Sequence, residues 1–230
     1  FLAGLELGSA ARFDGDGAPV PGRAAQGDAA GWVPVAARAA GLPASTPPVA
    51  WRQRADYQEG APGEYLGNAI ASGDSSITAK FGTPRGLVRR ARDPGSGLDS
   101  AAAWAVRPFP QPSLFPAVRR TLLALAADQT RFGITPGEGW AGGADPWSAP
   151  TAWSAWSFAA LAGSERAPQS ARADRRAALR LLADLRRAAT PAGAIPERVD
   201  AATGIPRSTT PLAWSHAFAI LALRQLWPSP

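Results

Sequence analysis

The sequence predicts an all-α fold, and three observations support that prediction. Hydrophobic residues make up 46% of the 230 residues, which is enough to build a substantial core. Alanine dominates this apolar set, and alanine favours helix over strand. Apolar residues recur at helical spacing in several blocks, whereas no long stretch alternates between apolar and polar residues as a half-buried strand does.

The first half of the chain contains short predicted helices between long irregular segments. Residues 1–12 are predicted to end a helix, and residues 31–41 to form a short helix around Trp32. Residues 47–70 are predicted to be helical in their first half. The loops between these helices are rich in glycine, aspartate and proline. Residues 72–97 are predicted to form a long irregular loop, and a loop of that length inside a domain is often functional.

Helical periodicity is stronger in the second half of the chain. Predicted helices cover residues 99–106, 113–130, 149–162, 169–190 and 211–227. Ser113 is the predicted N-cap of the second of these helices and Gly163 the C-cap of the third, while Pro211 occupies the first turn of the last. The tryptophans at 51, 104, 153, 156 and 227 are predicted to pack in the core.

Antiparallel helices joined by long loops at one end are typical of an α/α toroid, a solenoid or a helix bundle. Helix counting alone does not separate these architectures. The sequence contains no fixed-period repeat that would support a solenoid. The loops at residues 131–145 and 191–210 hold most of the side chains that could carry chemistry.

Composition excludes several classes of function. The chain has no cysteine, which excludes disulfides and thiolate metal sites. His216 is the only histidine, so a histidine-rich metal site is impossible and a structural hydrogen-bonding role is the simpler interpretation. No apolar run approaches the roughly 18–20 residues of a membrane span. We therefore predict no membrane partner.

The net charge of +6 does not indicate a nucleic-acid partner. Proteins that bind nucleic acids usually cluster lysine and arginine together. Here Lys80 is the only lysine, and the arginines are scattered in short pairs. Abundant alanine, glycine and proline beside arginine indicate a GC-rich coding bias instead. We therefore predict no nucleic-acid partner.

Glu197 is the best candidate for a chemical role. It lies in a loop just after a predicted helix, with Pro196 before it and Val199 two residues later. A carboxylate in this setting can sit at the lip of a pocket and act as a base if a donor keeps it ionised, and Ser208 could be that donor. The residues alone also allow a surface glutamate paired with Arg198.

The sequence around Glu197 reads P-E-R-V-D-A-A-T-G and is followed by P-L-A-W-S-H-A. These motifs resemble the C-terminal motif of glycoside hydrolase family 15, which includes glucoamylases, glucodextranases and some bacterial trehalases. The resemblance implies that Glu197 is the general base that activates water and that Ser208 orients it. Arg198 stands where glutamine is commoner in the family. Trp214, Ser215 and His216 match the family's W-S-H or W-S-Y stretch.

A second segment, residues 131–147, reads R-F-G-I-T-P-G-E-G-W-A-G-G-A-D-P-W. With a few residues inserted, it resembles the family's R-Y-x-E-D-x-Y-x-x-G-x-P-W loop. The resemblance implies that Arg131 binds sugar hydroxyls, that Trp140 and Trp147 line glucose subsites, and that Glu138 takes the acidic position. Aromatic faces stack on sugar C–H surfaces, and a fixed guanidinium donates to hydroxyls. Two shorter matches, at residues 55–57 and 98–101, occur in the expected order.

Inverting hydrolysis needs two carboxyl groups roughly 6.5–9.5 Å apart. In the family the general acid lies in a W-E-E motif, N-terminal to the helix that residues 1–12 resemble, and this sequence contains no W-E-E. The resemblance therefore implies that residues 1–230 are a single incomplete catalytic domain, the C-terminal half of an (α/α)6 toroid. We expect the general acid upstream of Phe1, in the missing N-terminal part of the same domain, and we expect this chain alone to be inactive.

The resemblance implies that the parent enzyme releases glucose from the non-reducing end of an α-glucan or a glucose oligosaccharide, with inversion. It implies no metal and no organic cofactor. Three alternatives stay open: a non-catalytic carbohydrate-binding or scaffold domain, a trehalase, and a glucosyltransferase on the same fold.

Overall fold

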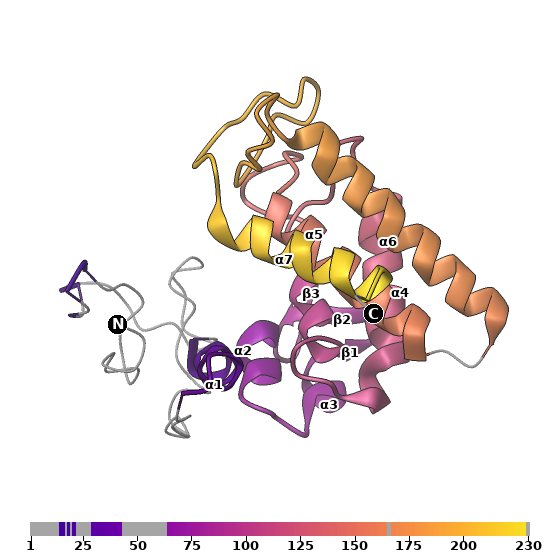
Figure 1. The fold of residues 1–230 in the computed structure, drawn as a ribbon. Coiled ribbons are helices and arrows are strands. Elements are labelled where there is room, and N and C mark those ends of the chain that lie inside the picture. The colour runs from indigo at the N-terminus through magenta and orange to yellow at the C-terminus, as the bar shows by residue number, and fades with distance from the viewer. Residues whose placement is uncertain are drawn as a thin grey trace. The chain divides into compact units, whose positions relative to one another are not determined.

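The computed structural model describes residues 14–16, 18, 20–21, 29–42, 64–164 and 167–228, and helices form most of its regular structure (Figure 1). The helices are α1 (Ala29–Ala39), α2 (Leu66–Ala71), α3 (Ile77–Phe81), α4 (Phe115–Ala127), α5 (Ser148–Ser164), α6 (Pro168–Ala188) and α7 (Ala213–Leu226), with 3-10 helices η3 (Ser100–Ala105) and η4 (Pro112–Leu114). Strands β1 (Gly82–Thr83), β2 (Gly86–Arg90) and β3 (Asp93–Leu98) form one sheet in the order β1-β2-β3. Among the described helices, none combines the length and the apolar character needed to span a membrane.

The chain divides into two compact units. The first contains Phe1–Gly82 and Val88–Pro94, and the second contains Thr83–Leu87 and Gly95–Pro230. In the first unit α1 contacts α2 closely, since a Cβ at Gly31 would lie 2.3 Å from the carbonyl oxygen of Ala71. The helices predicted for residues 1–12 and for the first half of 47–70, with Trp51 and residues 55–57, lie outside the described residues.

Lys80 forms ion pairs with two carboxylates of the first unit. Its Nζ lies 2.7 Å from both Glu64 Oε1 and Asp74 Oδ2. Burial opposes ionisation of Asp74, but hydrogen bonds from Lys80 and Ser76 outweigh it and hold the pKa of Asp74 well below its usual range. The three charges therefore stabilise one another beside α2 and α3.

The prediction of an irregular loop over residues 72–97 is wrong, because this segment contains α3 and all but the last residue of the sheet. The strands were missed because β3 reads D-P-G-S-G-L, which lacks any alternation of apolar and polar residues. In the second unit, Leu87 of β2 is tied to α4: its N–H donates to Thr121 Oγ1 at 2.8 Å. The fold is thus mainly helical with a small sheet, and the all-α prediction holds only in part.

The centre of the second unit is α5. Its residues from Ser148 to Leu161 are all buried, and it packs against α6, α7 and η3. Two polar contacts fix η3 on α5: Ser157 Oγ donates to the Ala103 carbonyl at 2.6 Å, and Trp153 Nε1 donates to the Ser100 carbonyl at 3.1 Å. The predicted core positions of Trp104, Trp153 and Trp156 are confirmed. Trp227, in contrast, is 54% exposed, so its core prediction is wrong.

Three predicted helix ends differ from the structure. Ser113 lies within η4, and the N-cap of α4 is Leu114, because Pro112 and Pro116 impose a 3-10 turn and then open the helix. Gly163 lies inside α5 rather than at its C-cap. Pro211 precedes Leu212, the N-cap of α7, so it stands outside the first turn.

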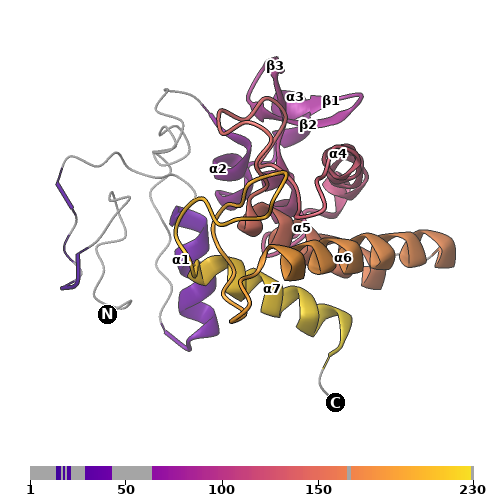
Figure 2. The same cartoon turned by 90° about the horizontal axis from the view of Figure 1, so that it is seen from above.

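Polar contacts join α4 and α6 near both ends of α4. Arg119 Nη2 lies 2.5 Å from Asp174 Oδ2, and Gln129 Nε2 donates to Asp184 Oδ2 at 3.0 Å. Both carboxylates are almost fully buried, at 3% and 1% exposure. Each contact joins residues 55 positions apart, so the two helices run in the same general direction (Figure 1). Figure 2 views α4 along its axis and α6 from the side.

Asp184 should make the stability of the protein depend on pH. Burial raises its pKa to about 6, although Arg187 opposes the shift. A carboxyl whose pKa is higher in the folded state stabilises the fold at acidic pH. That contribution is complete below the unfolded pKa and is lost as the pH rises through 6. We expect Asp184→Asn to remove this part of the pH dependence, about 2 kcal/mol between pH 4 and pH 7, in urea unfolding.

Arg187→Gln is the companion variant for this measurement. Because Arg187 lowers the pKa of Asp184, removing it should move the same loss of stability to higher pH. Identical pH dependence in wild type and Asp184→Asn would show that Asp184 does not titrate in this window.

Candidate functional site

Backbone hydrogen bonds on both sides fix the position of Glu197. Its N–H donates to the Thr209 carbonyl at 2.8 Å, and its carbonyl accepts from the Ser148 N–H at 2.9 Å. The Glu197 side chain is partly exposed, and it makes no hydrogen bond or ion pair with a residue that the structure describes. The backbone is therefore held, whereas the carboxylate is available to a substrate or to water.

Ser208 lies on the segment that pairs with the Glu197 loop. Val199 and Pro206 form an antiparallel bridge, and the Arg207 N–H donates to the Arg198 carbonyl at 2.9 Å. Beyond this pair the register shifts, because the Glu197 N–H donates to the carbonyl of Thr209, the residue after Ser208. Ser208 is exposed, and no hydrogen bond joins the two side chains. The structure thus places Ser208 on the segment that pairs with the Glu197 loop, and the orienting role of Ser208 stays a prediction.

Arg198 is paired with Asp145 and stacked on Trp147. Residues 147 and 198 form an antiparallel bridge, with the Arg198 guanidinium 5.9 Å from the centre of the Trp147 ring. Arg198 Nε lies 3.8 Å from Asp145 Oδ2, and Asp145 Oδ1 accepts from the Ala201 N–H at 3.1 Å. The alternative of a surface ion pair between Glu197 and Arg198 is therefore wrong.

Trp140 and Trp147 meet edge to face, with ring centres 6.1 Å apart and planes at 78°. Gly142 lies close to both rings: a Cβ there would lie 3.3 Å from Trp140 Cδ1 and 3.5 Å from Trp147 Nε1. Trp147 Nε1 and Arg198 Nε are buried donors with no hydrogen-bond acceptor among the described residues. The pair of tryptophans and the guanidinium thus offer apolar surface and donors side by side, which suits an oxygen-rich ligand.

Phe132 joins the two loops that carry the motifs. It is buried in a cluster with Ala188 and Val199, and Gly204 (φ +76°) approaches so closely that a Cβ would lie 2.4 Å from the Phe132 ring. The exposed Arg131 guanidinium lies 4.7 Å from the centre of the same ring. Arg131 is therefore held near Val199, two residues beyond Glu197, as expected if both loops face one site.

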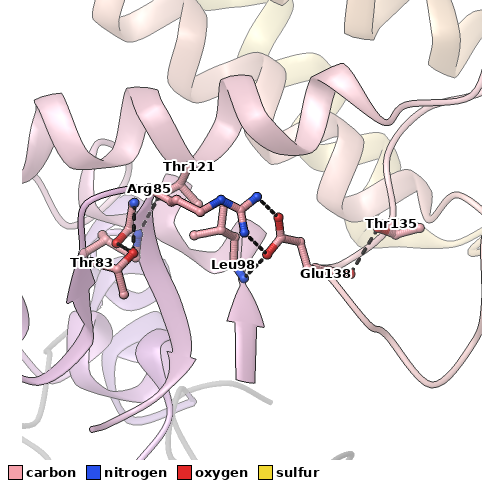
Figure 3. Close-up of polar contacts among 9 residues, drawn as sticks. Thr83, Arg85, Leu98, Thr121, Thr135 and Glu138 are labelled. Atoms are coloured by element: carbon pink, nitrogen blue, oxygen red, sulfur yellow. Dashed lines mark hydrogen bonds and ion pairs between the residues drawn. The ribbon is translucent and has the colours of Figure 1, made fainter. Parts of the chain in front are cut away.

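The Glu138 carboxylate binds other residues of the chain (Figure 3). Arg85 binds both of its carboxylate oxygens, at 2.5 and 3.1 Å, and the Leu98 N–H donates to Oε2 at 3.1 Å. The Glu138 N–H in turn donates to the Leu98 carbonyl at 2.9 Å. These contacts bind the loop at Glu138 to the end of β3. The role of Glu138 in substrate binding stays a prediction.

Asp200 shapes the turn after Glu197. Its Oδ1 accepts from the backbone N–H groups of Ala202 and Thr203, and Arg207 pairs with its other oxygen. The bond from Arg207, helped by those from Thr203, holds the pKa of Asp200 well below its usual range. Asp200 therefore holds the turn after Glu197, and its carboxylate stays ionised.

The chain resembles solved structures of glycosidases. No protein-family model and no curated protein matches it. A wild-type glycosidase superposes with a TM-score of 0.69 at 20% identity, covering 95% of this chain and 72% of that one. A substitution variant of glycosidase gives 0.70 with the same identity and coverage. The glucoamylase of Hormoconis resinae gives 0.55 at 12% identity, covering 88% of this chain and 41% of that one.

The fold is glycosidase-like. At identities this low the likeness shows the fold alone, so the role of each residue still rests on its sequence context and its contacts.

The structure confirms the predicted structural hydrogen-bonding role of His216, and it adds Asp145, which sequence reasoning missed. His216 Nε2 accepts the Ile195 N–H at 2.9 Å, and the Ile195 carbonyl accepts from the Leu212 N–H at 2.8 Å. Asp145 anchors Arg198 and the turn at Ala201. Only the D-P-W sequence before α5 could have drawn attention to Asp145. No local pattern could have paired His216 with a backbone 21 residues away.

Replacing His216 should loosen the loop that carries Glu197. An acceptor at this position requires a neutral imidazole with an unprotonated Nε2. We expect His216→Phe to speed amide hydrogen exchange at Ile195 by up to about tenfold, the value of one net hydrogen bond, as measured by NMR. His216→Gln keeps an acceptor and should restore most of the protection. Equal exchange in His216→Phe and wild type would refute the contact.

Gly97 should tolerate a methyl group far less well than Gly143. Both have positive φ, at +78° and +72°. A Cβ at Gly97 would lie 2.7 Å from the Glu138 carbonyl oxygen, whereas one at Gly143 meets nothing within 4 Å. We expect Gly143→Ala to cost about 1–2 kcal/mol from backbone strain alone. Gly97→Ala should cost about 1–3 kcal/mol more because of the steric clash. Equal costs in urea unfolding would mean that the close approach is absent.

Proposed function

We propose that the chain is the C-terminal part of the catalytic domain of an inverting, glucoamylase-like glycoside hydrolase of family 15, in which Glu197 is the general base. The observation that carries the proposal is a backbone fixed on both sides of a carboxylate that no described residue engages. A general base must be held in place yet keep its lone pairs for water. The glycosidase-like fold supports the proposal, and so do the two motifs that meet at Phe132.

In this proposal the surrounding residues bind the sugar and orient the Glu197 carboxylate. Ser208, which precedes the Thr209 whose carbonyl accepts from the Glu197 N–H, donates a hydrogen bond that orients the base. Arg131 donates to sugar hydroxyls, and the Trp140–Trp147 pair supplies the apolar surface of a glucose subsite. The Arg198 guanidinium occupies part of the Trp147 surface, so the sugar uses what remains. The helices form part of an (α/α)6 toroid.

The base acts together with a general acid that a longer protein supplies from sequence before Phe1. The acid protonates the oxygen of the leaving group while Glu197 takes a proton from water. That water attacks the anomeric carbon from the opposite face, so the glycosidic C–O bond breaks as the new C–O bond forms with inversion. The substrate is an α-glucan or a glucose oligosaccharide cleaved at its non-reducing end.

Glu197→Gln in the longer protein tests this function. General acid–base catalysis contributes about 10²–10⁴ to the rate, so kcat for glucose release from maltose should fall by that factor with KM little changed. NMR of the first product should show β-glucose from the α-linked substrate. Asp128→Asn is the control: it makes the same carboxylate-to-amide change at an exposed residue after α4 and should retain activity.

Three outcomes would contradict the proposal in different ways. Retained hydrolysis in Glu197→Gln would exclude Glu197 as the base. Binding of maltose without any hydrolysis by the wild-type longer protein would indicate a non-catalytic carbohydrate-binding domain. Turnover of maltose by residues 1–230 alone, abolished in Glu197→Gln, would show that the acid lies within this chain.

A further inference from the structure

An open groove runs between α4 and α6. Its volume is about 350 Å³. Two polar contacts, Arg119 with Asp174 and Gln129 with Asp184, join the same two helices and the residues just after α4. The lining runs from Ala173 to Leu181 along α6, which corresponds to about 12 Å at the rise of an α-helix. The groove therefore extends over about two helical turns.

The floor and walls of the groove are small and apolar. Alanines at 126, 127, 173 and 177 and leucines at 123 and 181 line it, together with Gln129. Leu123 is 49% exposed although it stands on a helix with a buried face. Small side chains allow a backbone to approach closely, and an exposed leucine beside them adds apolar surface to cover. Such a lining suits a second helix that presents apolar side chains at i, i+3 and i+4.

The rim of the groove is positively charged. Arg176 and Arg180 line it, are exposed, and stand one turn apart on α6, with Arg172 one turn before them. None of these three forms a hydrogen bond or ion pair with a described residue. By contrast Arg119 and Arg187, on the same two helices, pair with the buried carboxylates of Asp174 and Asp184. The rim thus presents guanidinium groups that no hydrogen bond or ion pair with a described residue engages, although the charge of Arg180 also acts on the buried Asp184 carboxylate.

We propose that this groove is the docking site for an acidic amphipathic helix of a partner protein. The helix places leucine and alanine side chains on the apolar floor and aligns glutamate or aspartate side chains with Arg176 and Arg180. Charge complementarity selects this occupant over a second copy of the chain, because a copy would bring the same arginines against one another. The proposal is independent of glycosidase activity and uses none of the residues proposed for catalysis.

The first measurement uses a synthetic helix of leucine, alanine and glutamate, about 15 residues long and labelled with a fluorophore. Fluorescence anisotropy with residues 1–230 should show saturable binding to this peptide. A peptide with lysine in place of glutamate should bind at least tenfold more weakly. Raising the salt from 0.1 M to 1 M should weaken binding of the acidic peptide, because the screening length falls from about 10 Å to about 3 Å. Equal binding of both peptides would overturn the charge argument.

Three variants locate the binding. Arg176→Glu with Arg180→Glu should reduce the affinity about tenfold or more, since two attractive pairs become repulsive. Arg224→Glu, the same change at an exposed arginine of α7, should leave the affinity within about twofold. Ala177→Phe fills the floor without changing charge and should weaken binding as well. Circular dichroism checks that each variant is folded.

Unchanged affinity in Ala177→Phe alongside a loss in the arginine variant would overturn the proposal, because it would indicate general attraction to a basic surface. Binding to vesicles of anionic phosphatidylglycerol, with no binding to the peptide, would assign the surface to a membrane instead. A dimer in light scattering that Ala177→Phe dissociates would assign it to a second copy. Any of these results leaves the test of Glu197 unaffected.

Discussion

The enclosure of α5 is the constraint on which the second unit depends. A helix that is buried from Ser148 to Leu161 has no face for water, so other elements must cover it on every side. Helices α6 and α7 and the 3-10 helix η3 do so. The enclosure also fixes the candidate site, because α5 begins where the loops meet. Ser148 binds the Glu197 carbonyl through its N–H, and the residue before it, Trp147, pairs with Arg198.

The helices could be predicted from sequence where one face is apolar and the other polar. The spacing of Leu122 and Leu125 in α4 gives that pattern directly, and both are buried. The sheet could not be predicted, because its strands are held by long-range pairing and by contacts such as Leu87 with Thr121 rather than by their own composition. Trp227 shows the opposite error: helical spacing favoured a core position, but the ring lies beyond the last turn of α7, against Arg175.

For the candidate site too, sequence predicted some features and missed others. Motif resemblance selected Glu197, Ser208 and the two tryptophans. The structure brings the tryptophan rings into contact and bonds the Glu197 N–H to the carbonyl of Thr209, the residue after Ser208. The resemblance did not anticipate that Arg85 and the Leu98 N–H engage Glu138. Nor did it show that Asp145, 53 positions before Arg198, anchors that arginine. Such contacts join residues far apart in the chain, so no local pattern records them.

The positions of the arginines on α6 cannot be explained by amino-acid composition. A bias toward arginine over lysine explains which cation is used, but not where each one lies. Asp174 and Asp184 are buried between α4 and α6 and would destabilise the fold if unpaired, and Arg119 and Arg187 neutralise them. Arg176 and Arg180 form no ion pair with a described residue, although the charge of Arg180 acts on Asp184, and they border alanine and leucine. The helix thus compensates the negative charge it buries and presents positive charge beside an apolar groove, the combination that an acidic helix complements.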